Sequence, residues 1–550
     1  MGKATPRRRT PTNGSSAPSN VSGQPQMNTV SSGAAATGSE KRGHALTKPA
    51  AGGKGIQSEL PDFILLIILY LLQGVPLGLI MGSVPFLLKS KLSFGDIALF
   101  SLSSYPYSLK LLWSPIVDSI YNKSIGRRKS WIVPIQAVTG VFLIFLSRSI
   151  DIYVSPESSE PVPVTFLALT FASLVFLCAT QDIAVDGWAL TLLSEENKAY
   201  ASTAQTIGLN SGYFLSFTVF LALNSREFCE KYLGVQEGPL VLLGQYLAFW
   251  GVMFLVCDLW LIFVKKEDPE LEEPAENEMQ IVYKHIFQVI NLPNMRQLIF
   301  MTMVSKIGFM AHDSVSALKL LEKGFSKEDL ALTVLIDFPI QIFVGYYVAK
   351  WSTGPRPLRP WLNAYYVRLG FSILGMLIVS SVPKTIGTSY FLFVILFSVL
   401  NSMVSTVMFV GVGSYYTKIS DPRIGGTYMT LLNTINNLAG TWPKYFVLKF
   451  VDYFTDAHCS GGRVAERGFS CTSEVSKKEC SKLGGVCALG QDGYYPVSLV
   501  CVVVGVVVLF TVVRPTVLAL EKVPDAAWRV ARDGDEGDES AQLMAGNKRD

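Results

Sequence analysis

Residues 63–88 read FILLIILYLLQGVPLGLIMGSVPFLL, an apolar run without a charged side chain. A helix of about 20 apolar residues crosses the hydrocarbon core of a bilayer, and it satisfies its own backbone hydrogen bonds there. The run therefore predicts a membrane span. Gln73 interrupts it beside Gly74 and Pro76, a break that would free backbone groups to line a site.

The rest of the chain repeats this pattern. Further apolar stretches lie near 96–120, 131–149, 164–192, 202–223, 241–264, 297–318, 330–350, 361–382, 388–416, 424–450 and 495–518. Of the 550 residues, 49% are hydrophobic and 16% are charged, whereas soluble domains carry about a quarter charged residues. The sequence predicts an all-α membrane protein with twelve transmembrane helices in two six-helix halves.

Polar stretches divide the chain into five expected parts. We expect a disordered cytosolic N-terminal tail (1–60), a first half (61–264), a cytosolic linker (265–296), a second half (297–520) and a cytosolic C-terminal tail (521–550). The linker begins with KKEDPELEEPAENE, which cannot enter a bilayer. No short apolar run with a cleavage site stands near Met1, so the first span is expected to start insertion.

The long loop 454–494, between the last two spans, bears on orientation. It contains Cys459, Cys471, Cys480 and Cys487. An even set of cysteines in a polar loop indicates two disulfides in an oxidising compartment, with three possible pairings. A zinc site is the alternative, but the spacing lacks a CxxC knuckle. The loop is therefore expected to be lumenal or extracellular, and the Lys and Arg residues of the opposite connections follow the positive-inside rule.

The connection after the second span carries a basic pattern. Asp118 ends the span, and Gly126, Arg127, Arg128 and Lys129 follow it. The pattern resembles the loop signature of the major facilitator superfamily, in which an Asp pairs with basic residues and latches one conformation, although the spacing here is wider. The alternative is that the basic residues only anchor the loop on the cytosolic side.

Ionisable residues inside the predicted spans point to a protein interior or a water-filled path, because a charge at mid-bilayer costs about 2.5–3.5 kcal/mol. These residues are Lys110, Asp182, Asp186, Lys306, Asp337 and Arg368. Asp182 and Asp186 are one helical turn apart and share a face, so one of them holds a proton or pairs with Lys110. They form either a coupling or gating pair or a structural ion-pair network.

Three blocks together resemble one known family. QDIAVDGWALTLL (181–193), SLKLLWSPIVD (108–118) with GRRKSW (126–131), and DPRIGGTYMTLLNTINNLAG (421–440) are similar to the acetyl-coenzyme A transporters of the endoplasmic reticulum membrane. The first two blocks also resemble bacterial muropeptide permeases. The resemblance implies a twelve-span major facilitator fold. It also implies alternating-access carriage of cytosolic acetyl-CoA into the endoplasmic reticulum or Golgi lumen, where lumenal acetyltransferases would use it.

Such a substrate needs cations, because phosphate that leaves water must find charge-assisted hydrogen bonds. Lys110, Lys306 and Arg368 are the predicted phosphate ligands. Each of them has an alternative role in an ion pair with an intramembrane acid. The candidate acids are Asp182, Asp186, Asp313 and Asp337.

Uncharged polar and aromatic groups complete the predicted site. Amides suit hydrogen bonding to adenine or pantetheine, and aromatic rings suit stacking; the same groups also fix helix packing or line membrane interfaces. The candidates are Gln73, Asn433, Asn436, Asn437, Tyr107 and Trp188. His312 and Asp313 are neighbours that suggest proton coupling, but they point about 100° apart on a helix, and exchange for free CoA is simpler.

Other function classes lack their required residues. The chain has no HExxH, GxSxG or Walker-type GxxxxGK[ST] motif, so we expect no enzyme, cofactor or metal. A net charge of +4 gives no nucleic-acid footprint. The remaining alternatives are a carrier of another amphipathic anion, such as a muropeptide-like solute, and a transmembrane acetyltransferase centred on His312. The sequence also leaves open whether the protein forms a homodimer.

Overall fold

The computed structural model describes residues 56–530 with gaps. The gaps are 155–159, 195–196, 198, 236–237, 268–277, 326–332, 334, 338, 342, 346, 349–355, 384, 421–424, 462–468 and 473. Residues 1–55 and 531–550 of the two predicted tails and residues 268–277 of the predicted linker therefore lie outside the described residues.

The first bundle comprises α1 to α12. Its elements are η1 (Ile56–Glu59), α1 (Leu60–Gly78), η2 (Leu79–Ser83), α2 (Val84–Lys89), α3 (Phe94–Ser101), η3 (Leu102–Ser104), α4 (Tyr105–Leu109), η4 (Lys110–Leu112), α5 (Ser114–Ser119), α6 (Lys129–Ser147), α7 (Ile150–Val154), α8 (Val164–Leu192), α9 (Ala199–Phe214), η5 (Leu215–Val219), α10 (Phe220–Leu223), α11 (Arg226–Phe228), η6 (Cys229–Leu233) and α12 (Leu243–Phe263). The second predicted span, 96–120, is thus a chain of short helical pieces. Pro106 and Pro115 lie in it and remove backbone donors.

The second bundle comprises α14 to α22 and follows the linker helix α13 (Glu278–Asn291). Its elements are α14 (Pro293–Ser305), α15 (Ile307–Glu322), α17 (Leu358–Ser380), α18 (Thr388–Ile419), α19 (Gly425–Tyr453), β1 (Asp456–Ser460), α20 (Glu474–Lys482), β2 (Val486–Gln491), α21 (Tyr494–Val508), η8 (Leu509–Val513), α22 (Arg514–Leu520) and η9 (Asp525–Trp528). The seventh predicted span is interrupted at Lys306, between α14 and α15.

The structure is consistent with the predicted number of spans. Within the described residues, eight helices are long and apolar enough to cross a membrane. The second and seventh predicted spans are divided into shorter helices, and α19 is long but more polar. The eighth predicted span, 330–350, is interrupted by several of the gaps named above.

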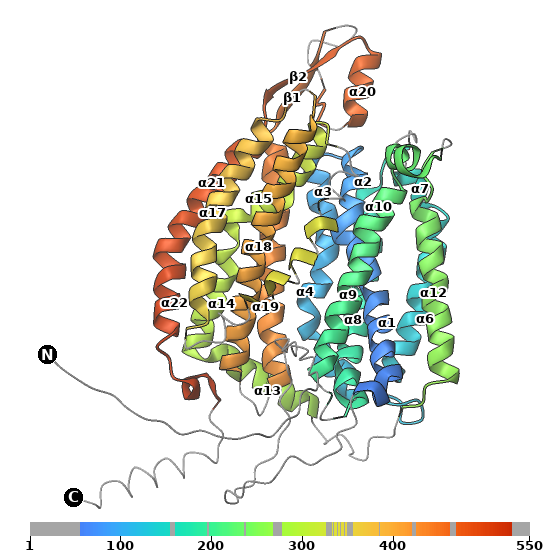
Figure 1. The fold of residues 1–550 in the computed structure, drawn as a ribbon, viewed down its shortest axis with the longest axis vertical. Coiled ribbons are helices and arrows are strands. Elements are labelled where there is room, and N and C mark those ends of the chain that lie inside the picture. Colours follow the sequence, from blue (N-terminus) through green and yellow to red (C-terminus); the bar gives the residue numbers. More distant parts are fainter. Residues whose placement is uncertain are drawn as a thin grey trace, which may run out of the picture.

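The two bundles stand side by side in Figure 1, the first coloured blue to green and the second yellow-green to red. We call the end that bears β1, β2 and α20 the hairpin end, and the end that bears α13 the linker end (Figure 1). Within the first bundle α1 packs on α9 and α6 on α12; within the second, α15 packs on α21 and α17 on α18. Helix α19 packs against α3 and α4 and so joins the bundles.

Helices α1 and α9 approach closely through glycines. A Cβ on Gly74 would lie 2.3 Å from the backbone oxygen of Leu209, and one on Gly212 would lie 2.2 Å from that of Leu71. Small residues let transmembrane backbones touch, which replaces the hydrophobic driving force that lipid does not supply. The same packing fixes the side of α1 that faces the middle of the molecule.

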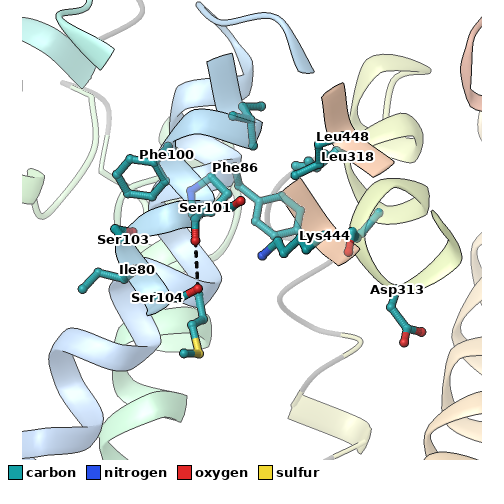
Figure 2. A pocket seen from close by; sticks show the side chains of 15 residues that line it. Ile80, Phe86, Phe100, Ser101, Ser103, Ser104, Asp313, Leu318, Lys444 and Leu448 are labelled. Carbon is teal, nitrogen blue, oxygen red and sulfur yellow. Dashed lines mark hydrogen bonds between the residues drawn. The ribbon is translucent and has the colours of Figure 1, made fainter. Parts of the chain in front are cut away.

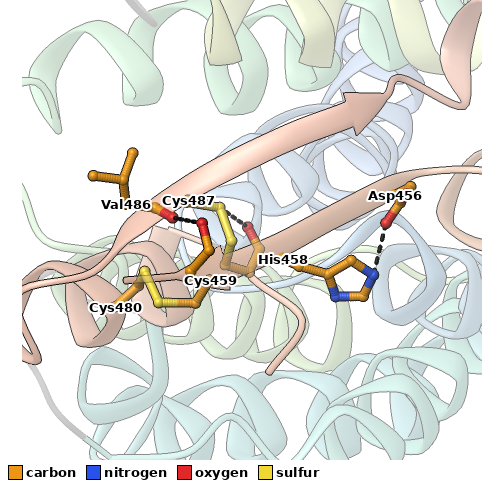
Figure 3. The surroundings of a disulfide bond; sticks show 8 residues. Asp456, His458, Cys459, Cys480, Val486 and Cys487 are labelled. Carbon is orange, nitrogen blue, oxygen red and sulfur yellow. Dashed lines mark hydrogen bonds and ion pairs between the residues drawn. A yellow bond between two sulfur atoms is a disulfide. The ribbon is translucent and has the colours of Figure 1, made fainter. Parts of the chain in front are cut away.

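The predicted disulfide loop forms a small stapled hairpin. Strands β1 and β2 pair antiparallel, with Cys459 opposite Cys487. Disulfides join Cys459 to Cys480 and Cys471 to Cys487 (Figure 3), so the structure confirms the disulfides and selects one of the three pairings. The bonds occupy all four sulfur atoms, and the zinc alternative is therefore wrong.

Candidate substrate site between the two bundles

An ionic cluster lies inside the first bundle. Because α8 holds Asp182 and Asp186 one turn apart, both carboxylates face Lys110 of η4. The Lys110 ammonium donates to Asp182 and lies 3.6 Å from Asp186. Further hydroxyl and amide donors surround the pair: Tyr70 and Gln205 donate to Asp186 at 2.8 Å, and Tyr107 donates to Asp182 at 3.3 Å.

This cluster gives Lys110 the role of an ion-pair partner. One cation meets two carboxylates, and the Asp182 side chain has no exposure to solvent. The sequence left open whether Lys110 binds phosphate or pairs with an acid, and the structure places it in the pair. The positive charge of Lys110 is therefore already engaged by these two acidic side chains.

Arg368 is likewise paired. Its guanidinium donates to Asp313 at 2.8 Å and lies over the Phe309 ring, 4.2 Å from the ring centre. His312 shares a 3.1 Å hydrogen bond with Ser316 and does not meet Asp313 through an ion pair. The two neighbours therefore point to different partners, as their helical spacing predicts.

Lys306 differs from these two cations. It lies at the break between α14 and α15, and its ammonium donates to the backbone oxygen of Asn436 at 2.8 Å. Within the part of the chain that the structure describes, no carboxylate forms an ion pair with it. Lys306 is the one predicted phosphate ligand whose charge is not balanced by a described carboxylate.

A cavity opens between the bundles on the hairpin side of these clusters. It is lined by Ile80, Met81, Pro85, Phe86, Ile97, Phe100, Ser101, Ser103 and Ser104 of the first bundle and by Asp313, Ser314, Ala317, Leu318, Lys444 and Leu448 of the second. In Figure 2 the Lys444 ammonium points into the space between the bundles, whereas the Asp313 carboxylate points away from it. Among the described residues Lys444 has neither a hydrogen bond nor an ion pair.

Sequence reasoning missed Lys444, although the signal was present. The residue falls inside the predicted span 424–450, where the cost of a charge would have singled it out as it did Lys306. Its partner-free position, by contrast, depends on how α19 packs against α3, which sequence patterns do not show.

The other predicted polar candidates are dispersed. Gln73 is 1% exposed, and neither of its amide atoms has a hydrogen-bond partner among the residues that the structure describes. Asn433 is exposed on α19, and Asn436 and Asn437 are half-buried there. Asp337 accepts a hydrogen bond from Gln341 at 2.6 Å.

The two aromatic candidates for stacking differ in access. Trp188 is 2% exposed and packs in an apolar cluster of the first bundle with Leu66 and Ile183, so its ring is covered. Tyr107 is half-buried and its hydroxyl is engaged by Asp182.

At the linker end, the basic loop contacts the residues that the sequence proposed. Arg128 donates to the Asp118 carboxylate at 2.6 Å, and Arg127 donates to the Asp118 backbone oxygen at 2.9 Å. Glu267, after α12, accepts from the backbone N–H groups of Arg128 and Lys129 at 2.9 Å each. All of these residues belong to one bundle or its immediate continuation, so the contacts fold the loop against its own bundle.

At the hairpin end, ion pairs join the two bundles. Lys89 of α2 lies 2.5 Å from Glu322 of α15, and Glu322 also pairs with Lys319 at 2.8 Å. Lys319 pairs in turn with Asp492, directly after β2, at 2.9 Å. Both lysines lie over the Phe94 ring, 4.1 and 5.0 Å from its centre. We call Lys89, Lys319, Glu322 and Asp492 the hairpin-end latch.

The comparisons with known proteins agree with this architecture. The family model described as Acetyl-coenzyme A transporter 1 matches residues 62–359 and 354–530. An uncharacterized membrane protein of Saccharomyces cerevisiae is 40% identical over 555 residues, which cover 87% of this chain and 98% of that protein. The anhydromuropeptide permease of Escherichia coli is 26% identical over 177 residues, covering 32% of this chain and 33% of the permease.

Solved structures share the fold. A bacterial homologue of the human lysosomal transporter Spinster aligns with a TM-score of 0.54 and 14% identity, covering 86% of this chain and 100% of its own. The nucleoside transporter NupG aligns with a TM-score of 0.52 and 12% identity, covering 84% of this chain and 100% of its own. These structures, like the matched family, are of transporters and not of enzymes. The chain therefore belongs to the acetyl-coenzyme A transporter family and is a multi-pass secondary transporter with the major facilitator fold.

Proposed function

We propose that this transporter carries acetyl-CoA from the cytosol into the lumen of the endoplasmic reticulum or Golgi by alternating access. The observation that carries the proposal is the cavity between the bundles, which presents the unpaired Lys444 ammonium in a chain of the acetyl-coenzyme A transporter family. A cation that has left bulk water favours an anionic ligand, because the ligand supplies charge-assisted hydrogen bonds.

The direction follows from the two ends of the molecule. Disulfides persist in oxidising compartments, so the hairpin end with Cys459–Cys480 and Cys471–Cys487 is proposed to face the lumen. The linker end bears Arg127, Arg128 and Lys129, which the positive-inside rule assigns to the cytosol. Both tails would then be cytosolic.

The arrangement of contacts supports alternating access. The hairpin-end latch holds the two bundles together on the proposed lumenal side, so the described conformation is closed there. Substrate would enter from the cytosol, and the bundles would rock to release it after the latch opens. Asp118 with Arg127 and Arg128 would guide the cytosolic closure, and Asp182 with Asp186 would sense the state of the site.

Exchange fits the chemistry of the cargo. Acetyl-CoA and free CoA share the phosphate-bearing end, so a site that recognises this end would accept CoA on the return step. Lumenal acetyltransferases would consume the acetyl group and supply that CoA.

Uptake into proteoliposomes tests the proposal. Acetyl-CoA labelled on the acetyl group is compared with acetyl-CoA labelled on the adenine. Equal accumulation of the two labels, faster after preloading with CoA, is expected for an exchanger that moves the intact molecule. Entry of the acetyl label alone, or of neither label, would contradict it.

The similarity to the anhydromuropeptide permease favours one alternative, a carrier of muropeptide-like anions. A muropeptide added in excess separates the two. It should leave acetyl-CoA uptake unchanged, whereas strong competition together with muropeptide accumulation would favour the alternative.

A further inference from the structure

We infer that Lys444 and Lys306 together bind the phosphate groups of the coenzyme A end and hold that end against the second bundle. The inference rests on the proposed acetyl-CoA carriage and assigns the substrate's orientation within the site. It adds to the site Lys444, a residue that lines the cavity from α19.

The two lysines follow one face of α19. The Lys306 ammonium bonds to the backbone oxygen of Asn436, and it lies 3.5 Å from the position that a Cβ on Gly440 would occupy. Lys444 stands four residues after Gly440, on the same face and about 6 Å further along the helix axis. Two cationic groups thus follow each other from the helix break at Lys306 toward the cavity.

Neither ammonium is neutralised by a described carboxylate. Lys306 bonds to a backbone oxygen, and the part of the chain that the structure describes gives Lys444 no polar partner. Arg368 and Lys110, by contrast, are held by Asp313 and by Asp182 with Asp186. The free positive charge around the cavity is therefore concentrated on α19 and the α14–α15 break.

The first bundle, across the cavity from α19, has a different balance of charges. In the ionic cluster of the first bundle one cation faces two carboxylates. In the second bundle, Asp313 is the one described carboxylate that forms an ion pair with any of Lys306, Arg368 and Lys444. Among the described residues, the positive charge that no carboxylate pairs with lies on the wall formed by the second bundle, so charge favours an orientation in which the phosphates face that wall. The first-bundle lining near Lys444 is apolar and hydroxylic, including Phe86, Phe100 and Ser101, and suits the largely neutral pantetheine arm.

Competition binding with purified protein in lipid nanodiscs tests this inference. Labelled CoA is displaced by unlabelled CoA, by adenosine 3',5'-bisphosphate, which keeps phosphates but lacks the arm, and by acetylpantetheine, which keeps the arm but lacks phosphate. Lys444→Gln is expected to weaken CoA and the bisphosphate by about tenfold or more, because each loses a charge-assisted bond. Acetylpantetheine should displace labelled CoA from Lys444→Gln at the same concentration as from the wild type. If it does not displace CoA from the wild type, it should not displace CoA from the variant either.

Matched variants distinguish the loss of the positive charge from a loss of folding. Lys444→Arg should retain most of the affinity, and Lys306→Gln should weaken the same two ligands. Lys449→Gln removes an exposed cation of the same helix and should change nothing. Size-exclusion profiles and thermal unfolding show whether each variant is folded.

Two results overturn the inference. One is unchanged CoA binding in folded Lys444→Gln; the other is weaker CoA binding with unchanged bisphosphate binding, which would place Lys444 away from the phosphates. Both leave the proposed function intact if the wild type transports acetyl-CoA. A wild-type protein that binds no CoA would overturn the proposed function as well.

Discussion

The two ends of this transporter are held in different ways. At the hairpin end, Lys89 of the first bundle meets Glu322 of the second, and its side chain is 3% exposed. At the linker end, the described pairs Asp118–Arg128 and Arg359–Glu521 each stay within one bundle. There the linker helix α13 contacts η4 through a 2.6 Å hydrogen bond from the Tyr283 hydroxyl to the Leu112 backbone oxygen. Rocking must break contacts between bundles but carries contacts within a bundle along unchanged, so the hairpin end is where opening costs most.

Breaking the latch at its centre should have the largest effect. Glu322→Gln leaves Lys89 and Lys319 without their shared carboxylate, and removing one partner of a buried ion pair costs about 3–5 kcal/mol. The closed state should lose population, and uptake should fall more than tenfold. A cysteine introduced at Ser104, which lines the cavity, should react faster with an impermeant maleimide from the hairpin side.

Glu521→Gln serves as the control for that experiment. Glu521 is 5% exposed and pairs with Arg359 within the second bundle. This variant should lose stability without changing maleimide access to the cavity. Equal labelling of the Glu322 and Glu521 variants would show that the latch does not close the hairpin end.

Removing the disulfide Cys471–Cys487 should have the next largest effect. Cys487 lies in β2, and Asp492 follows that strand into the latch, so the staple fixes where the Asp492 carboxylate stands. Replacing both cysteines by serine should destabilise the hairpin by about 2–4 kcal/mol. Thermal unfolding and maleimide access measure the two consequences. Wild-type access in this variant would mean that the latch is independent of the staple.

Asp118→Asn should have a smaller effect, on rate and not on access. The Asp118 side chain is 43% exposed and its partner Arg128 is 10% exposed, so solvent screens the pair and its loss costs below about 1 kcal/mol. Uptake should slow by a few-fold, while the Ser104 cysteine keeps its wild-type reactivity. A large increase in that reactivity would make the linker end a second latch.

The smallest effect is expected from an exposed pair on the first bundle. Arg226 and Glu230 form an i,i+4 pair with side chains 66% and 42% exposed. Glu230→Gln should change stability by less than about 0.5 kcal/mol and leave uptake as in the wild type. Transport assays and thermal unfolding check both, and a defect would show that burial is not what separates the latch from ordinary surface pairs.

Much of the fold could be predicted because its signals are local. A run such as 63–88 predicts a membrane span because its length and apolarity match the bilayer. Four cysteines in one polar loop likewise favour two disulfides, although the sequence left a zinc site as the alternative. The loop contact between Asp118 and Arg128 could also be expected, since ten residues separate them in the chain. Of the candidate site, only the ionisable residues inside the predicted spans could be named from the sequence; their partners could not.

The sequence by itself determined which residues had to be shielded from lipid, because the cost of a charge at mid-bilayer does not depend on its neighbours. The tertiary structure decided which charges cancel. Lys110 meets Asp182 across 72 residues and Arg368 meets Asp313 across 55, while Lys306 and Lys444 meet no described carboxylate. Such pairings depend on how helices distant in sequence pack, because the Coulomb energy of an ion pair falls with distance and those distances are set only in the folded chain.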